Sequence, residues 1–438
     1  MAVFSSISER AIEHIRELVE AGGCDLHLHT HCSDGSDSPE GLVKRVLDAG
    51  LKAFAVTDHD TLSAIEPVQA ALDAYTLETG SESNPVVIPG VELSVDDGQE
   101  LHLLGYFPFG GETVLESFLH EQRVKREARN QQMLDRLAAL GYPIAQAEFQ
   151  AAGEEVLGRM QIALLLVKGG YFTTVSDVFN QLIGEGKPGY LERTRPSIEE
   201  AIQAIRAAGG AAVLAHPALY GWCGEGPFIQ LELIHRLKYY QSIGLQGVEA
   251  YHGEASPECQ LQVASAARIV GLLATCGSDD HGKHKMHAHM YQGSTRFGEQ
   301  TSVLVTAALI EGQTESGEQG LMLTRRSGQR RYAGLWEFPG GKVEPGEEPE
   351  SSLERELLEE LEARANIGSL VLALHHDYDD LQVVLLCYKA ALLDQPVLDP
   401  EVHDGICFST LQDARGFDLL GADYFVLDEL ERQHYLPA

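Results

Sequence analysis

The chain has 438 residues, of which 44% are hydrophobic and 22% are charged. Compared with a typical domain of about 150 residues, this length indicates two or three domains, and the apolar content excludes a disordered chain. The formal charge of −34 at pH 7 would repel a long polyphosphate, so long duplex nucleic acid is not an expected partner.

No apolar run approaches the roughly 20 residues of a membrane-spanning helix, since even Val383 to Leu393 is broken by Lys389. No membrane partner is therefore expected. The seven cysteines stand at irregular spacing, and the N-terminal segment does not have the pattern of an export signal. These features predict a cytoplasmic chain whose thiols are reduced.

From Asp25 to about His281, short apolar runs rich in β-branched residues alternate with helical stretches. This alternation predicts parallel strands joined by helices, an α/β barrel or open sheet whose chemistry gathers at the carboxyl ends of the strands. Between about residues 112 and 196 helical periodicity replaces the strand pattern, which indicates a helical insertion.

The polar stretch 284–300 has no clear periodicity and is expected to be a linker. After it, short alternating strands surround one acidic helix, Pro349 to Glu362, which predicts a smaller α+β domain. The expected domains are therefore residues 1–283, with the insertion at about 112–196, and residues 301–438.

Histidines and carboxylates stand where the apolar runs of the first domain stop. In Asp25-Leu-His-Leu-His, the side chains of Asp25, His27 and His29 share one face of a strand, because side chains alternate between faces. Two imidazoles on one face can clamp a metal ion, although such a pair is equally typical of hydrogen-bonded core histidines. Seven further histidines and carboxylates lie at the ends of apolar runs, which favours a metal site. The expected ligands are His27, His29, Asp34, His59, Glu92, His102, His216, Asp279 and His281.

These positions resemble those of the polymerase and histidinol phosphatase (PHP) superfamily of metal-dependent phosphoesterases. The resemblance implies a distorted (β/α)7 barrel that holds two or three metal ions, with Glu92 as a bridging ligand. Mixed imidazole and carboxylate ligands suit Mn²⁺, Zn²⁺ or Fe²⁺ better than Mg²⁺. Such ions activate water and neutralise phosphoryl oxygens. Asp25, Asp58 and Glu249 are expected to orient imidazoles or donate a proton to the leaving oxygen, unless they only cap strand ends.

Basic residues of the insertion indicate which class of substrate the first domain binds. Arg126 and Arg129 share a helix face at i, i+3, and Arg159 and Lys187 follow them. The order of these segments is similar to that of PHP members that remove phosphate from nucleoside 3′,5′-bisphosphates, and related members digest short RNA from the 5′ end. Members often carry His where this chain has Gln161. For each of these basic residues taken alone, the alternative to a role in substrate binding is an ordinary side chain exposed to solvent.

The acidic helix of the second domain has a spaced motif, Gly341-Lys-Val-Glu-Pro-Gly-Glu347, followed after seven residues by Arg355-Glu-Leu-Leu-Glu-Glu360. Glu356, Glu359 and Glu360 share one helix face, where a cation relieves their mutual repulsion, and Mg²⁺ suits oxygen ligands. This motif resembles the Nudix box, and residues 321–360 are similar to the 8-oxo-dGTP diphosphatases.

The Nudix resemblance implies hydrolysis of a nucleoside triphosphate to a monophosphate and pyrophosphate. By the same resemblance Arg355 belongs to the catalytic set with the three glutamates, Glu401 is a further metal ligand, and the triphosphate is contacted by Arg326, Gly340 and Gly341.

Two residues depart from the family pattern. Glu362 replaces the Gly that ends the box, which allows the helix to run on by a turn. Asp423 stands where the oxidised-guanine enzymes use Asn to read the base, so the hydrogen-bond pattern of the pocket changes. This leaves a pyrimidine or a 2-hydroxypurine as alternative bases.

The sequence thus predicts a bifunctional hydrolase of nucleotides or short oligoribonucleotides. Its first half would act on nucleoside 3′,5′-bisphosphates or RNA 5′ ends, and its second half on nucleoside triphosphates, oxidised ones among them. The alternative is a histidinol-phosphatase-like PHP enzyme with a regulatory, nucleotide-sensing Nudix domain.

Overall fold

A computed structural model describes residues 2–80, 84–150, 157–284, 303–328, 331–379 and 381–436. The expected linker lies outside these residues except for His284. The chain divides into two compact units. The first is Met1–Gly221 with Leu237–Gln260 and Val270–Phe297, and the second is Trp222–Arg236 with Leu261–Ile269 and Gly298–Ala438.

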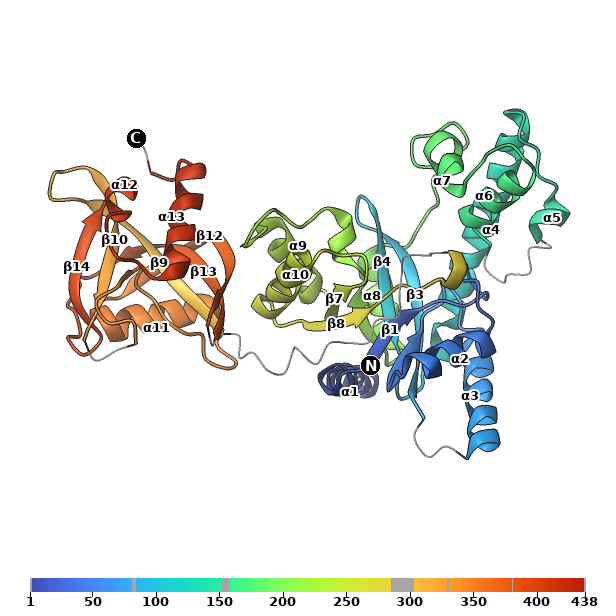
Figure 1. Ribbon diagram of the computed structural model, residues 1–438, viewed down its shortest axis with the longest axis horizontal. Helices are drawn as coiled ribbons and strands as arrows, with labels where there is room; N and C mark the ends of the chain where they lie inside the picture. The colour runs from blue at the N-terminus through green and yellow to red at the C-terminus, as the bar shows by residue number, and fades with distance from the viewer. Residues whose placement is uncertain are drawn as a thin grey trace. The chain divides into compact units, whose positions relative to one another are not determined.

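The first unit is built on a seven-stranded sheet in the order β1-β2-β3-β4-β5-β7-β8 (Figure 1). Its strands are β1 (Cys24–Leu28), β2 (Ala53–Val56), β3 (Val86–Asp96), β4 (Glu100–Tyr106), β5 (Ala211–Leu214), β7 (Gly247–His252) and β8 (Leu273–Gly277). A parallel bridge joins Leu28 to Asp280, just after β8, so the two edges of the sheet meet. The sheet therefore forms a nearly closed barrel, as the sequence predicted.

One strand of this barrel runs against the predicted direction. β4 pairs antiparallel with both β3 and β5, whereas the other neighbouring strands are parallel. The cause is local: Asp96 pairs with Glu100 across a short turn in which Gly98 has φ of 75° and donates its N–H to Asp96 Oδ1 at 2.9 Å. A three-residue loop with a left-handed glycine makes a hairpin rather than a helical crossover.

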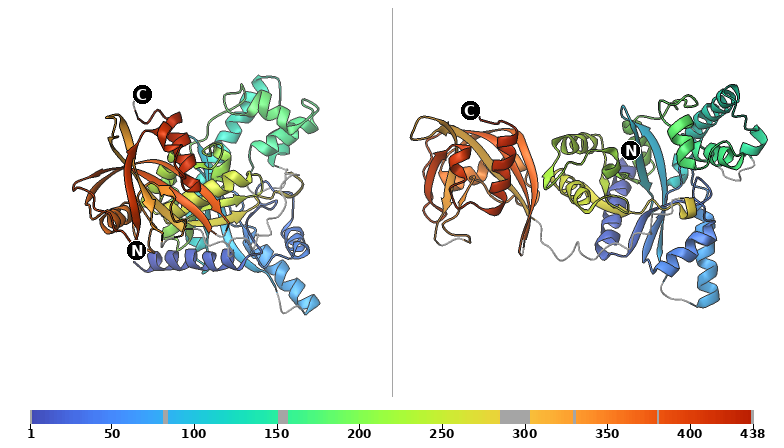
Figure 2. Two further views of the ribbon diagram at one scale, coloured as in Figure 1. Left: turned by 60° about the vertical axis from the view of Figure 1, so that its left-hand side comes forward. Right: turned by 45° about the horizontal axis from the view of Figure 1, so that its top comes forward.

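Helices cover the outside of the barrel. They are α1 (Ala2–Ala21), α2 (Pro39–Ala49), α3 (Ile65–Thr79) and α8 (Ile198–Ala207). Two more helices, α9 (Leu231–Ser242) and α10 (Pro257–Ile269), have residues in both compact units. The long helix α1 packs against β5, β8 and α8 (Figure 2). Helix α8 begins with a capping box, in which Ser197 Oγ accepts the N–H of Glu200 and the Glu200 carboxylate accepts the N–H of Ser197.

The predicted insertion is helical and has its own small core. It contains η1 (Glu112–Leu115), α4 (Glu116–Ala139), α5 (Gln146–Gln150), α6 (Arg159–Lys168), α7 (Val175–Val178) and the π-helical turn η2 (Phe179–Ile183). Met133, Leu137, Ile162 and Leu166 are fully buried in this core. In Figure 1, α5, α6 and α7 lie apart from α2 and α3.

The second unit contains a mixed sheet in the order β11-β10-β9-β13-β12-β6, with β14 paired to β10. Its elements are β6 (Phe228–Ile229), β9 (Val303–Gln313), β10 (Gln319–Arg326), β11 (Trp336–Glu337), α11 (Pro349–Leu361), β12 (Ala365–Tyr378), β13 (Leu381–Leu392), β14 (His403–Ser409), α12 (Leu411–Ala414) and α13 (Gly421–Arg432). Leu309, Leu323, Leu374, Leu385 and Val426 fill the core. The expected α+β fold is confirmed.

The acidic helix α11 ends at Leu361, so the expectation that Glu362 allows an extra turn is wrong. Glu362 itself adopts the left-handed conformation, with φ of 47° and ψ of 26°, and its N–H reaches the carbonyl of Leu357. The helix therefore stops where the family motif places glycine, although a side chain in this conformation is strained.

Five cysteines, Cys24, Cys32, Cys276, Cys387 and Cys407, are free. The expectation of reduced thiols is wrong for Cys223 and Cys259, which are disulfide-bonded. Among the described helices, none combines the length and apolar character that crossing a membrane requires.

Gly111 lies in close contact with the backbone at Ala208, and its substitution measures how tightly these two segments of the first unit pack. Gly111 has φ of 104°, and a Cβ there would lie 2.1 Å from the carbonyl oxygen of Ala208. Replacing Gly111 with Ala should lower the free energy of unfolding by more than about 2 kcal/mol, because clash adds to backbone strain. The control is Gly98→Ala, where φ is 75° but no atom lies within 4 Å; backbone strain alone should cost about 1 kcal/mol. Equal urea midpoints for the two variants, followed by circular dichroism, would contradict the packing argument.

Candidate active sites

A buried carboxylate lies at the centre of the barrel mouth. Glu92, on β3, is fully buried, and imidazole nitrogens from four other strands surround it. The distances to its carboxylate oxygens are 3.3 Å from His27 Nε2, 3.2 Å from His29 Nε2, 3.1 Å from His59 Nδ1, 2.8 Å from His102 Nδ1 and 3.3 Å from His216 Nε2. Although burial alone would raise the pKa of Glu92, the imidazoles of His59, His102 and His27 hold it well below its ordinary value.

Two further carboxylates complete the cluster. Asp279 Oδ1 lies 3.3 Å from His27 Nε2 and 3.1 Å from His29 Nε2. Asp34 Oδ1 lies 3.1 Å from His281 Nε2, and its other oxygen lies 3.7 Å from His59 Nε2. The nine side chains that the sequence singled out therefore converge on one cluster. Eight of them fall into three overlapping groups whose ligand atoms lie within 4.8 Å of one another, one around Asp34, one around Asp279 and one joining His59, Glu92 and His102. The ninth, His216, joins the cluster through its contact with Glu92.

The residues fit a multinuclear metal centre. His27 Nε2, His29 Nε2 and Glu92 Oε2 are buried and make no hydrogen bond within the described part of the chain. Nitrogen lone pairs and carboxylate oxygens repel one another at such distances unless cations lie between them. Mixed imidazole and carboxylate donors suit first-row transition metals. The cluster is therefore a metal centre.

Carboxylates behind the cluster fix the orientation of two histidines. Glu249 accepts from His27 Nδ1 at 3.1 Å and from the backbone N–H of His216 at 2.9 Å. This contact places the proton of His27 on Nδ1 and leaves Nε2 as a lone pair toward Glu92. Asp25 accepts the backbone N–H groups of His27 and Ser278.

Asp58, proposed from the sequence as a reacting group, is turned toward the loop that carries Asp34. Its carboxylate accepts the Thr30 N–H at 2.8 Å, the Thr30 hydroxyl at 2.7 Å and the Ser33 hydroxyl at 2.5 Å. These three bonds occupy both oxygens, which favours a part in holding the loop over a part in proton transfer.

Strained backbone accompanies the ligands. His216, after β5, and Asp279, after β8, have φ of 29° and 55°. Residues with side chains rarely adopt this region, and they persist there when surrounding contacts hold them. His281 is held by its own contact, because Nδ1 lies 2.9 Å from the carbonyl of Asp279 and thereby turns Nε2 toward Asp34.

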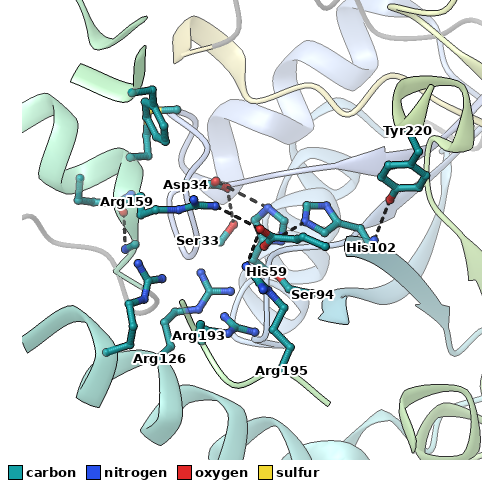
Figure 3. A pocket seen from close by; sticks show the side chains of 16 residues that line it. Ser33, Asp34, His59, Ser94, His102, Arg126, Arg159, Arg193, Arg195 and Tyr220 are labelled. Carbon is teal, nitrogen blue, oxygen red and sulfur yellow. Dashed lines mark hydrogen bonds and ion pairs between the residues drawn. The ribbon is translucent and has the colours of Figure 1, made fainter. Parts of the chain in front are cut away.

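A cavity of about 420 Å³ opens beside the metal centre. Its lining includes Asp34, His59 and His102 on one side and five arginines on the other, Arg126, Arg129, Arg159, Arg193 and Arg195. Figure 3 shows the side chains of Arg126, Arg193 and Arg195 pointing toward His59 and Asp34.

Two carboxylates hold four of these arginines in pairs. Asp60 binds Arg126 at 2.5 Å and Arg193 at 3.1 Å, and Glu100 binds Arg159 at 3.3 Å and Arg195 at 2.6 Å. Both carboxylates therefore have lowered pKa values, that of Glu100 at about 2, because the neighbouring cations outweigh the effect of burial.

Arg129 differs from the other four. Within the described chain no carboxylate lies within ion-pair distance of it, and its Nη1 contacts Met133 Sδ at 2.9 Å. Burial, together with the nearby Arg126, Arg159 and Arg193, lowers the pKa of Arg129 to about 9. A buried guanidinium without an acid partner is a site that an anionic ligand would stabilise.

The structure brings Arg126, Arg129 and Arg159 to the cavity but leaves Lys187 exposed and outside its lining. Sequence reasoning missed Arg193 and Arg195. Their signal was the alternate spacing in Arg193-Thr-Arg195-Pro, just before the capping box of α8, a local concentration of cations in an acidic chain.

The second unit contains a cavity of about 520 Å³ that is lined by both charged and aromatic side chains. The polar part of its lining includes Arg326, Glu337, Gly340, Gly341, Glu356, Glu360 and Asp423, and the apolar part includes Tyr332, Phe338, Tyr378 and Leu385. A ligand with a charged group and a flat aromatic ring would match this combination.

The glutamates of α11 do not all face this cavity. Glu356 and Glu360 line it, whereas the side chain of Glu359 is 60% exposed and lies 3.3 Å from Arg355. Arg355 also binds Glu347 and Glu356 and donates to the carbonyl of Lys342, so it ties the glycine-rich loop to the helix. Glu401 is exposed and outside the cavity lining.

Close packing explains the paired glycines. A Cβ on Gly340 would lie 2.1 Å from the carbonyl oxygen of Thr306, and one on Gly341 would lie 2.2 Å from Glu356 Cδ. Only glycine lets this loop lie against both β9 and the carboxylate of α11.

Asp423 lines this cavity together with Glu337, Glu356 and Glu360. Its Oδ2 is buried and has no hydrogen-bond partner within the described chain. Burial and the charge of Glu337 raise the pKa of Asp423 well above its ordinary value, against the smaller effects of the Phe338 N–H and Arg326. The group is therefore held toward its neutral form, which can donate as well as accept.

Comparison with known proteins matches both units. The PHP domain model matches residues 25–210, and the NUDIX domain model matches residues 303–427. The 5′-3′ exoribonuclease Rnm of Salmonella typhimurium is 33% identical over 259 residues, covering 59% of this chain and 84% of that protein. The chain belongs to the PHP family.

Two other relatives extend the comparison. The 3′,5′-nucleoside bisphosphate phosphatase of Chromobacterium violaceum is 31% identical to the PHP chain over 261 residues, covering 59% of the chain and 86% of the relative. The CTP pyrophosphohydrolase of Escherichia coli is 32% identical over 124 residues, covering 28% of the chain and 87% of the relative. The protein is thus a PHP phosphoesterase that also carries a NUDIX hydrolase domain.

The central carboxylate predicts how firmly the PHP chain retains metal. Glu92→Gln should lower metal affinity by at least about 100-fold, because a neutral amide replaces the charge that the imidazoles share. Elemental analysis after dialysis measures the retained metal. The control is Glu148→Gln, at an exposed position of α5; equal metal content in the two variants would contradict the assignment.

Proposed function

We propose that the PHP half hydrolyses phosphate esters of nucleotides that carry a second phosphate, namely nucleoside 3′,5′-bisphosphates or the 5′ ends of short RNA. The observation that carries this proposal is the arginine cavity beside the metal centre. One phosphate would face the metal ligands, and the second would meet the guanidinium groups across the cavity. The two PHP relatives named above support this substrate class.

Different residues of the PHP half would bind the metal ions, orient a ligand and align the substrate. His27, His29, Asp34, His59, Glu92, His102, His216, Asp279 and His281 would hold two or three ions, for which Mn²⁺, Zn²⁺ and Fe²⁺ are the proposed identities. Such ions supply an activated water and neutralise phosphoryl charge. Glu249 keeps the ring of His27 oriented, and the arginines align the substrate.

We further propose that the NUDIX half, residues 301–438, releases pyrophosphate from nucleoside triphosphates, with Mg²⁺ held by Glu356 and Glu360. The triphosphate would bind Arg326 and the backbone of Gly340 and Gly341. The base would pack against the aromatic side chains of the lining, with Asp423 forming hydrogen bonds to its edge. A neutral carboxyl group matches an acceptor beside a donor, the pattern that cytosine presents.

Both activities can be tested on the purified full chain. With Mn²⁺, it should release phosphate from 3′-phosphoadenosine 5′-phosphate, and with Mg²⁺ it should release pyrophosphate from CTP in a panel of triphosphates that includes 8-oxo-dGTP. Faster turnover of histidinol phosphate than of the bisphosphate would overturn the first proposal and favour the alternative assignment. Absence of pyrophosphate release would overturn the second.

Arg129 is predicted to distinguish bisphosphates from simple phosphate esters. Arg129→Met should reduce kcat/KM for the bisphosphate by about 30- to 150-fold, the effect of losing a charged hydrogen bond of about 2–3 kcal/mol. Hydrolysis of p-nitrophenyl phosphate, which has no second phosphate, should change less than about threefold, since it lacks that contact.

The control for Arg129 is Lys168→Met, an exposed cation on α6. It should behave as the wild type with both esters. An equal loss with both esters in Arg129→Met would point to damaged folding instead of lost recognition.

Asp423 is predicted to make base selection depend on pH. As pH rises the carboxyl group ionises and becomes only an acceptor, so the preference for CTP over GTP should fall in the wild type. In Asp423→Asn the amide keeps a donor and an acceptor, so its preference should not change with pH. The measurement is the ratio of kcat/KM values for CTP and GTP over the pH range in which both proteins stay folded. Parallel profiles for the two proteins would refute this assignment.

A further inference from the structure

A buried histidine outside the predicted site lies behind the acidic face of α11. His403 begins β14 and is 1% exposed. Its Nε2 lies 3.0 Å from Glu337 Oε1, and its Nδ1 lies 3.8 Å from Glu360 Oε2. Both carboxylates line the NUDIX cavity. The buried imidazole therefore contacts two carboxylates of that cavity without itself belonging to the cavity lining.

Glu337 determines which nitrogen of the ring donates. Arg326 Nη1 donates to both of its oxygens, at 2.8 and 2.6 Å, which marks the group as a carboxylate acceptor. The facing nitrogen of His403, Nε2, is therefore the donor. In a neutral ring the remaining nitrogen, Nδ1, carries a lone pair.

That lone pair points to a missing partner. Nδ1 of His403 is buried and makes no hydrogen bond with any described residue. It faces Glu360 Oε2, and two electron-rich atoms in a buried site repel each other unless a cation lies near both. Two atoms that bind one first-row ion at about 2.1 Å each lie about 3.0 to 4.2 Å apart, depending on the angle at the metal. The observed 3.8 Å falls within this range.

We propose that His403 Nδ1 and Glu360 ligate the same divalent cation, so that the NUDIX metal site is a mixed nitrogen and oxygen site. The inference rests on the proposed hydrolase function of this half. Arg326 and Glu337 then act as positioning residues, since a carboxylate that binds the far nitrogen of a ligating imidazole fixes its ring. Imidazole suits Mn²⁺ better than Mg²⁺, which prefers oxygen, so the site should discriminate between the two ions.

The first experiment compares metal dependence in the full chain. Pyrophosphate release from CTP is measured against Mn²⁺ and Mg²⁺ for the wild type, His403→Ala and His403→Gln. Both variants should need about tenfold or more Mn²⁺ for half-maximal rate, with a change below about threefold for Mg²⁺. The control is His434→Asn, at an exposed turn with φ of 50°, a conformation that Asn tolerates. Equal shifts for both ions, or no shift, would overturn the proposal.

The second experiment does not depend on turnover. Pulsed electron paramagnetic resonance detects ¹⁴N nuclei bound to Mn²⁺, and the difference between wild type and His403→Ala removes the signals of the barrel histidines. A ¹⁴N coupling in this difference is expected, and its absence would overturn the proposal. If the wild type releases no pyrophosphate, the proposed activity fails, whereas the ¹⁴N difference still decides whether His403 binds the ion. Should His403→Ala fail to fold, His403→Gln provides the same difference.

Discussion

The PHP half depends on one buried charge. Glu92 places a carboxylate at the barrel mouth, where five imidazoles reach it from β1, β2, β4 and β5 or the residues that follow them. Burying an ionised carboxylate is unfavourable unless opposite charge accompanies it. The same strands that close the barrel thereby create a site that only cations can neutralise. Folding and metal binding are coupled here, because the ligand atoms come from segments that meet only in the folded chain.

Much of this arrangement could be predicted from the sequence. The period of two in Asp25-Leu-His-Leu-His puts His27 and His29 on one face, and apolar runs that end in polar residues predict convergence at strand ends. The spacing of Glu356 and Glu360 likewise fixes one helix face. These are short-range patterns, and local geometry is enough to interpret them.

Other features depend on contacts between distant segments, which local patterns do not encode. Arg193 and Arg195 enter the cavity because Asp60 and Glu100 bind them from other parts of the chain. His403 reaches Glu360 because backbone bonds, such as Ser327 N–H to the carbonyl of Val402, fix the start of β14. Glu362 ends a helix although glycine is the usual residue, since the residues on either side of it, Leu361 and Ala363, are both fully buried and this packing overrides a local preference.

The loop at Asp60 shows how the PHP half combines two kinds of specialisation. Its carboxylate binds Arg126 and its carbonyl accepts from Arg123, so helix α4 of the insertion is fastened directly to the loop after a metal ligand. The metal-binding groups come from the barrel strands and the residues that follow them, whereas all five arginines of the cavity come from the insertion. Substitutions in the inserted helices can therefore change substrate specificity without altering the metal ligands. Such a division allows one ancestral phosphoesterase to give rise to enzymes with different nucleotide substrates and the same catalytic barrel.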